Sequence, residues 1–209
     1  MKYYLSSYKI GSEESVKQLI SLMPSNKKIA YVPNALDFSD DLARRAKSEL
    51  ADIEQLKSVG FRPEKFDLRD YFSNKDALLD DFSQFNSVYV RGGNVFVLRQ
   101  AMAISGFDDL LIQIANESED FLYSGYSAGV CILAPSLKGM ELVDDPDISP
   151  YPQQTTTIWS GLNLLDFMIV PHYDSMHRES NAMIDVVEYY KKEGIRFKTL
   201  KDGDVIIVK

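Results

Sequence analysis

The residues best suited to chemistry lie in the segment Gly125–Gly129, which reads Gly-Tyr-Ser-Ala-Gly. This is the G-x-S-x-G pattern, in which a strand turns sharply into a helix and leaves the serine hydroxyl exposed at the tip. The flanking glycines leave room for strand and helix to approach each other, and the helix N-terminus favours developing negative charge. The pattern therefore predicts that Ser127 is a nucleophile. The alternative is a tight turn in which Ser127 only caps the helix.

A second glycine-containing turn, Arg91–Asn94 (Arg-Gly-Gly-Asn), also follows an apolar run and precedes an apolar helix. Adjacent glycines let the backbone approach a ligand, so a free N–H here could stabilise an oxyanion together with the N–H of Ala128. In isolation the turn is equally typical of a plain strand-to-helix connection. A phosphate site is disfavoured because neither the dinucleotide-binding nor the P-loop spacing is present.

The sequence offers two histidines as a general base, His172 and His177. His172 follows Val-Pro at the end of an apolar run, and a strand end holds an imidazole in a fixed orientation better than a loop does. His177 lies in a polar segment, which is typical of a surface histidine. We therefore expect His172 to be the base.

The residue that would orient this imidazole is left open by spacing alone. The acidic residues between the serine and the histidine are Glu141, Asp144, Asp145, Asp147 and Asp166. Glu141 lies between two apolar residues, which indicates partial burial, whereas the three that follow it are typical of a solvated loop. Asp174 is a further candidate, but a residue so close in sequence rarely reaches the far nitrogen of its own histidine neighbour.

Composition excludes several other classes of protein. The 209 residues carry a formal charge of −8, which disfavours generic nucleic-acid binding. One cysteine, Cys131, and two histidines cannot complete a zinc site of four nitrogen and sulfur ligands, and we expect no metal and no organic cofactor. The same single cysteine rules out an internal disulfide, and we interpret it as a small buried apolar residue. No apolar run approaches a membrane span, and the N-terminus enters a strand-like run, so we expect a cytoplasmic protein with no membrane partner.

Short β-branched or aromatic runs alternate with longer amphipathic runs, which predicts an α/β fold with a mostly parallel sheet and helices on both faces. Residues 1–209 show no linker and predict one domain, as a monomer or homodimer. A long helix is predicted from an N-cap at Ser39 to about Val59, and a hairpin is predicted at the C-terminus. The apolar face of this helix, which is expected to point to the core, carries Leu42, Ala46, Leu50, Ile53 and Leu56. The expected strands are 2–6, 28–32, 65–68, 87–90, 121–124, 164–170, 196–200 and 205–208. The other expected helices are 13–23, 77–82, 95–104, 108–116, 130–134 and 181–192.

Taken together, the two glycine turns and the Val170–His172 segment resemble the serine peptidase family of dipeptidase E, or alpha-aspartyl dipeptidase, to which cyanophycinase is related. The resemblance covers most of the chain. It implies a fold like that of the class I glutamine amidotransferases, with the nucleophile on the strand-to-helix turn. It also implies hydrolysis of short peptides, with N-terminal Asp-X dipeptides as the expected substrates and no cofactor.

Carried over by position, the resemblance makes Ser127 the nucleophile, His172 the general base, and the N–H groups of Gly93 and Ala128 the oxyanion donors. The family's third member follows the nucleophile helix, and Glu141 is the nearest match, with Asp144 and Asp145 as alternatives. Substrate binding is expected from Arg178, Arg91 and Asn94.

The sequence departs from the enterobacterial dipeptidases in two places that bear on substrate specificity. The segment between His172 and the Arg178-Glu179 pair is shorter, and Arg91 replaces a third glycine. Two other functions are compatible with the pattern. One is an esterase of the α/β-hydrolase type, and the other is a non-catalytic protein that binds a small molecule on the same scaffold.

Overall fold

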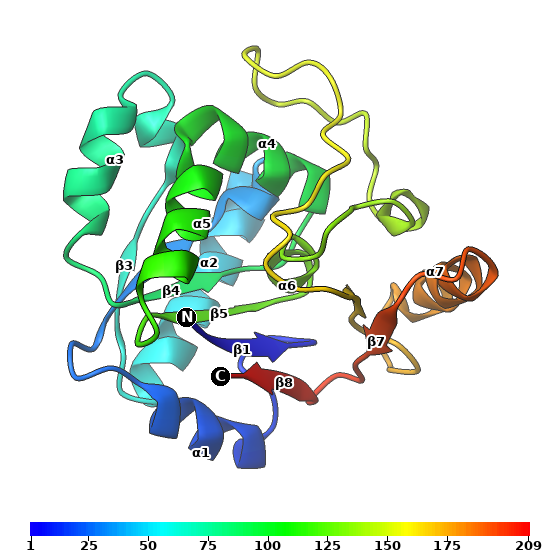
Figure 1. Cartoon of the computed structure of the whole chain (residues 1–209), viewed down its shortest axis with the longest axis horizontal. Coiled ribbons are helices and arrows are strands. Elements are labelled where there is room, and N and C mark those ends of the chain that lie inside the picture. Colours follow the sequence, from blue (N-terminus) through cyan, green and yellow to red (C-terminus); the bar gives the residue numbers. More distant parts are fainter.

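A computed structural model describes all residues, 1–209. Its main sheet has six strands in the order β3-β2-β4-β5-β1-β8, of which the first five are parallel and β8 is antiparallel to β1. Figure 1 shows β1 and β8, and with them the two ends of the chain, lying side by side. The strands of this sheet are β1 (Lys2–Ser6), β2 (Lys28–Val32), β3 (Arg62–Lys65), β4 (Ser87–Val90), β5 (Leu122–Tyr126) and β8 (Val205–Val208).

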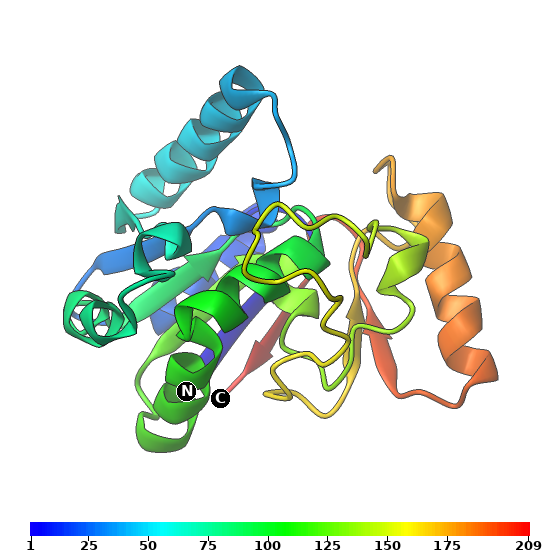
Figure 2. The same cartoon turned by 90° about the horizontal axis from the view of Figure 1, so that it is seen from above.

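Helices cover both faces of the sheet, because consecutive strand residues point to opposite faces and the central strands are buried throughout. On β4, for example, Tyr89 packs with α1 and α2, whereas Val88 and Val90 pack with α3 to α6. Figure 2 shows α2 on the side opposite α4 and α5. The helices are α1 (Glu13–Leu22), α2 (Leu42–Ser58), α3 (Lys75–Phe82), α4 (Val95–Ser105), α5 (Phe107–Glu117), α6 (Ala128–Cys131) and α7 (Ser180–Lys192).

The C-terminal segment does not form the predicted hairpin. Strand β7 (Phe197–Thr199) pairs in parallel with β6 (Met168–Val170), whereas β8 pairs with β1 in the main sheet. The turn between β7 and β8 therefore crosses from one sheet to the other beside the end of β1, where the Ser7 N–H donates to the carbonyl of Asp204. Strand β6 is also shorter than predicted, because residues 164–167 make irregular contacts with the α6 end.

Helix α2 presents a different face to the protein from the one its apolar pattern predicts. Leu42 and Leu50, expected in the core, are 70% and 57% exposed. The buried face instead carries Arg45, Glu49 and Asp52, followed by Leu56. The N-cap is Asp41, whose carboxylate accepts from the Arg44 N–H, and not Ser39.

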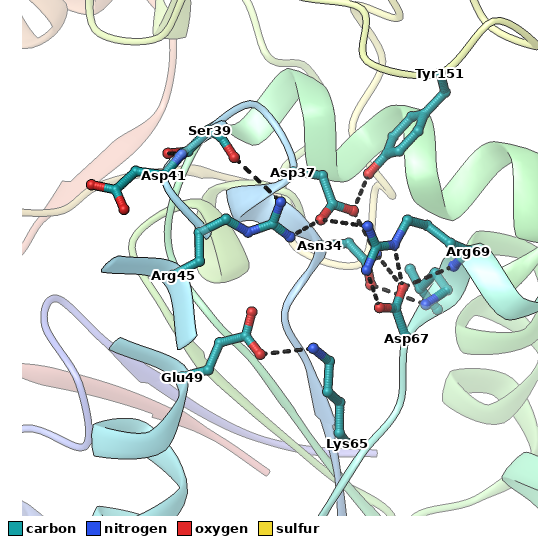
Figure 3. Close-up of polar contacts among 11 residues, drawn as sticks. Asn34, Asp37, Ser39, Asp41, Arg45, Glu49, Lys65, Asp67, Arg69 and Tyr151 are labelled. Carbon is teal, nitrogen blue, oxygen red and sulfur yellow. Dashed lines mark hydrogen bonds and ion pairs between the residues drawn. The ribbon is translucent and has the colours of Figure 1, made fainter. Parts of the chain in front are cut away.

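One of the buried polar residues of α2, Arg45, belongs to a network around Asp37, which follows the 3₁₀ helix η1 (Asn34–Leu36) and is drawn in Figure 3. Its carboxylate, 3% exposed, accepts hydrogen bonds from Arg45, Asn34 and Tyr151. The network ties α2, η1 and the loop that contains Tyr151 together. Polar interactions therefore hold the start of α2 in place where apolar packing does not. The other 3₁₀ helices are η2 (Leu68–Tyr71) and η3 (Met140–Leu142).

None of the seven α-helices combines the length and the apolar character needed to span a bilayer.

Candidate active site

Ser127 sits at the turn between β5 and α6, in a strained backbone conformation with φ 50° and ψ −120°. A residue other than glycine rarely adopts such a positive φ, and the strain costs on the order of 1–3 kcal/mol. The flanking glycines make the turn possible: a Cβ on Gly125 or Gly129 would lie 2.5 Å or 2.0 Å from the carbonyl oxygen of Val90. The predicted role of these two glycines is therefore confirmed.

Replacing Gly129 with alanine should destabilise the protein, because the added methyl group would overlap the end of β4. We expect a loss of about 1–3 kcal/mol in the free energy of unfolding, the usual cost of overpacking, measured by denaturant titration. Gly194→Ala is the control. It also has a positive φ, of 65°, but no atom lies within 4 Å of the added methyl group. A smaller loss in Gly129→Ala than in the control would contradict the close approach.

The turn Gly92–Gly93 places backbone N–H groups beside Ser127. A Cβ on Gly92 would lie 2.8 Å from the Cβ of Ser127, and Gly93 has φ 151° and presses against the carbonyl oxygen of Ala35. The N–H groups of Gly93 and Ala128 are paired with no protein acceptor. Two donors are therefore free near the serine, the arrangement that oxyanion stabilisation needs.

His172 follows β6, is 1% exposed and has φ 57°. Its Nδ1 lies 2.6 Å from Oδ1 of Asp202, in the turn between β7 and β8. Ser7, just beyond β1, joins the two residues: its hydroxyl oxygen accepts from the His172 backbone N–H at 2.8 Å and donates to Asp202 Oδ1 at 2.9 Å. Asp202 thus fixes the imidazole, and Ser7 links Asp202 to the backbone of His172.

The pKa of His172 is lowered from its usual value of 6.5, mainly because burial disfavours the charged imidazolium. The nearby His177 lowers it further, whereas the hydrogen bond to Asp202 opposes the shift. A lowered pKa keeps the imidazole neutral at neutral pH. With Nδ1–H directed at Asp202, Nε2 has a free lone pair, as a general base requires.

The structure corrects the expectation that Glu141 orients the histidine. The Glu141 carboxylate accepts from the backbone N–H of Gly139 at 2.5 Å, and Glu141 does not line the cavity that holds His172. The two alternatives are also engaged elsewhere: Asp144 accepts from the Val95 N–H and Asp145 from the Asp147 N–H. The acid that contacts His172 lies 30 residues after it in the chain, and not between it and Ser127.

Two residues that sequence reasoning set aside lie against His172. Asp202 lies in the turn of the predicted C-terminal hairpin, and the only sequence signal for it is an Asp-Gly pair between the last two predicted strands. His177, interpreted as a surface histidine, stacks on His172 with ring centroids 3.7 Å apart and planes 13° apart. Tyr8 packs against both imidazole rings. No hydrophobic periodicity or motif in the sequence predicts a stack of two histidines.

A cavity of about 430 Å³ brings the two glycine turns and the histidines together. Of the expected site residues, the lining contains Ser127, His172, Gly93, Arg91 and Arg178. Helix α2 forms the facing wall with Arg44, Arg45, Ser48, Ala51 and Asp52. The cavity explains why α2 turns its polar face toward the protein, since that face lines the cavity.

The three expected substrate-binding residues differ in what they can reach. Arg178 lines the cavity with a side chain that is 72% exposed and only weakly paired with Glu179, at 3.3 Å. Arg91 also lines it but is 4% exposed, donating to Tyr126 and Ser48 and lying 3.4 Å from Asp52. Only Nη2 of Arg91 is therefore engaged by hydrogen bonds, whereas Nε and Nη1 are buried and form none.

Asn94 differs from the expectation, because the structure uses both ends of its amide. Its Oδ1 caps α4 by accepting from the N–H groups of Phe96 and Val97, and its Nδ2 donates to the carbonyl oxygen of Asp145. Asn94 is 4% exposed and does not line the cavity. It positions the glycine turn and does not face a ligand.

His172, His177 and Glu179 place possible metal-ligand atoms within 4.8 Å of one another. The two imidazoles are nearly parallel and stacked, so their in-plane lone pairs cannot converge on one ion without a rotation of one ring. Nδ1 of His172 is moreover occupied by Asp202. The donor set as it stands does not fit a metal ion.

The fold and the site define a class of α/β protein: a mostly parallel sheet between helices, with a serine on a strained strand-to-helix turn, like the class I glutamine amidotransferases. The profile of peptidase family S51, the dipeptidase E family, matches residues 5–209. The chain therefore belongs to peptidase family S51, and the resemblance stated from its motifs is confirmed.

Relatives with similar sequences carry peptidase names. An uncharacterized peptidase of Listeria innocua, Lin0382, is 30% identical over 58% of this chain. Peptidase E of Streptomyces coelicolor is 26% identical over 91% of this chain and 72% of its own length. The match to the Listeria innocua protein spans only about half, 54%, of that relative.

Solved structures confirm the predicted fold class. A Listeria monocytogenes protein assigned as a peptidase E superposes with a TM-score of 0.70 at 22% identity, covering 100% of this chain and 98% of the other. A peptidase from an acI-B1 actinobacterium gives a TM-score of 0.62 at 14% identity, covering 100% of this chain and 83% of the other.

Proposed function

We propose that the protein is a serine peptidase that cleaves short peptides through Ser127, His172 and Asp202. The observation that carries this proposal is the buried, neutral His172, held by Asp202 in the same cavity as a strained serine. Ser127 Oγ makes no hydrogen bond, so it is free to attack a substrate. Membership of peptidase family S51 supports the same reaction.

The proposed reaction is acyl transfer in two steps. His172 Nε2 removes the Ser127 proton as Oγ attacks the scissile carbonyl carbon, and the N–H groups of Gly93 and Ala128 stabilise the oxyanion. The imidazolium, stabilised by Asp202, then gives its proton to the leaving amine. Water, activated by the same imidazole, hydrolyses the acyl-enzyme and restores the free serine.

The charge of the cavity supports an acidic substrate, and we propose peptides with an N-terminal aspartate. Its lining holds five basic side chains, Lys9, Arg44, Arg45, Arg91 and Arg178, against three acidic ones, Asp52, Asp144 and Glu179, in a chain whose net charge is −8. Lys9 and Arg44 have no carboxylate partner, although Arg45 and Arg91 do. A locally positive cavity would attract a carboxylate against the overall charge.

The proposed substrate class is tested by a panel of dipeptides with N-terminal Asp, Glu, Asn and Leu, together with an aspartyl arylamide and a matched carboxylic ester. We expect Asp-X to have the highest kcat/KM, and amides to be cleaved as well as the ester. Hydrolysis of the ester alone would point to an esterase and contradict the proposal.

Arg178 is the expected partner of the substrate aspartyl carboxylate, because its side chain reaches the cavity and is mostly free. Arg178→Gln should therefore lower kcat/KM for Asp-Leu by roughly 10–100-fold, the range of a charge-assisted hydrogen bond, and change that for Asn-Leu much less. Lys47→Gln, on the exposed side of α2, is the charge-matched control. Equal losses on both dipeptides would contradict this role.

A further inference from the structure

The three carboxylates that line the cavity differ in their partners. Asp52 lies 3.4 Å from Arg91, and Glu179 lies 3.3 Å from Arg178. Asp144 forms no ion pair, and the one hydrogen bond to its carboxylate is from the backbone N–H of Val95 to Oδ2, at 2.8 Å. One carboxylate in the cavity is therefore without a cation, and the reaction proposed above gives it no role.

Asp144 lies close to the reacting centre. Val95 begins α4 only two residues after Gly93, one of the proposed oxyanion donors. Asp144 thus contacts the first residue of α4 and lines the same cavity as Gly93 and Ser127.

Covalent geometry limits where the amino group of a substrate's first residue can lie. The α-nitrogen is two bonds from the scissile carbonyl carbon, which puts it roughly 2.5 Å from that atom. When the carbonyl oxygen occupies the oxyanion site and its carbon faces Ser127, the amino group must lie beside the same two turns. A carboxylate that binds it must come from that side of the cavity.

We propose that Asp144 binds the α-ammonium group of the substrate's N-terminal residue and so selects peptides with a free N-terminus. This inference rests on the proposed peptidase function and adds a specificity-determining residue to it. The Val95 N–H orients the carboxylate, and the ammonium supplies the missing cation. Arg178, which lines the same cavity, remains available for the aspartyl side chain.

The environment of Asp144 gives this contact a pH dependence. Burial and, to a smaller extent, the charge of Glu179 raise the pKa of Asp144, while the Val95 N–H and Arg178 lower it, and together they bring it to about 7. The carboxylate is charged above this pKa, whereas a peptide α-amino group is charged below about 7.7–8.0. Binding of a free N-terminus should therefore be strongest between these two values and weaken as the pH falls below 7.

The test compares Asp-Leu with N-acetyl-Asp-Leu in the wild type and in Asp144→Asn. The asparagine keeps an oxygen for the Val95 N–H but loses the charge. We expect the preference for the free dipeptide, as a ratio of kcat/KM values, to fall roughly 10–100-fold in the variant. In the variant, the fall in kcat/KM for Asp-Leu near pH 7 should also disappear. Only the fall caused by protonation of His172, below pH 6.5, should remain.

Asp145→Asn is the matched control, because Asp145 is exposed and its carboxylate bonds only the Asp147 N–H. An unchanged preference in Asp144→Asn, or an equal loss on both substrates, would overturn the role and leave Asp144 a helix cap. A wild type that cleaves both dipeptides equally would overturn it too, with the peptidase function intact. A wild type that cleaves no peptide or arylamide would instead refute the proposed function.

Discussion

Ser127→Ala should abolish peptide hydrolysis, with kcat falling by roughly four orders of magnitude or more. Alanine removes only the hydroxyl oxygen, so the strained φ of 50° and the packing of the turn against β4 remain. The free energy of unfolding should therefore stay within about 0.5 kcal/mol of the wild-type value. The measurements are kcat on an aspartyl arylamide and denaturant unfolding of both proteins.

Covalent labelling gives a second, independent measurement of the same prediction. A fluorophosphonate should modify the wild type once, at Ser127, and should not modify Ser127→Ala. Ser136→Ala, which removes a half-buried hydroxyl outside the cavity, should leave both hydrolysis and labelling unchanged. Full activity in a folded Ser127→Ala protein would show that another group is the nucleophile and would refute the proposed mechanism.

The glycine turns were predictable from the sequence because each is a short contiguous motif at a strand-to-helix junction. Gly125 and Gly129 are required by atoms of the neighbouring strand β4, and parallel strands bring such turns to one edge of the sheet. Most strands and helices were likewise predicted to within a few residues, since their apolar patterns face a core on one or both sides.

Helix α2 shows where the apolar pattern fails. Periodicity places Leu42 and Leu50 in the core, but the helix turns Arg45 and Asp52 inward, to Asp37 and to Arg91. Ion pairs between elements far apart in the sequence decide this orientation, and no local pattern encodes them. The polar side of α2 then supplies one wall of the cavity, so the error in the predicted face coincides with the functional region.

The acid that orients His172 was missed for a topological reason. A hairpin would have kept β7 and β8 together and away from His172. Because β8 instead pairs with β1, the turn before it passes the end of β1 and carries Asp202 to Ser7 and His172. Sequence distance from the histidine gives no indication of this contact.

Asp202→Asn should lower kcat by roughly 10⁴-fold, by analogy with the loss of the aspartate in serine-protease triads. An asparagine can turn its amide N–H toward Nδ1 of His172, which then becomes the acceptor and leaves the proton on Nε2. The imidazole in that tautomer cannot remove the Ser127 proton. KM for Asp-Leu should change little, because Asp202 does not line the cavity.

Glu141→Gln is the matched control, since it makes the same chemical change in the acid that the sequence favoured. It should retain wild-type kcat, because the Glu141 carboxylate bonds Gly139 and does not contact His172. The reverse result, with Glu141→Gln inactive and Asp202→Asn active, would restore the sequence-based assignment. Asp202→Glu separates the charge of the side chain from its position, because the longer side chain keeps the carboxylate acceptor but must displace Ser7. We therefore expect a kcat between that of the wild type and that of Asp202→Asn. The order Asp202→Glu above Asp202→Asn therefore identifies the carboxylate charge, and not the packing of the turn, as the property that His172 uses.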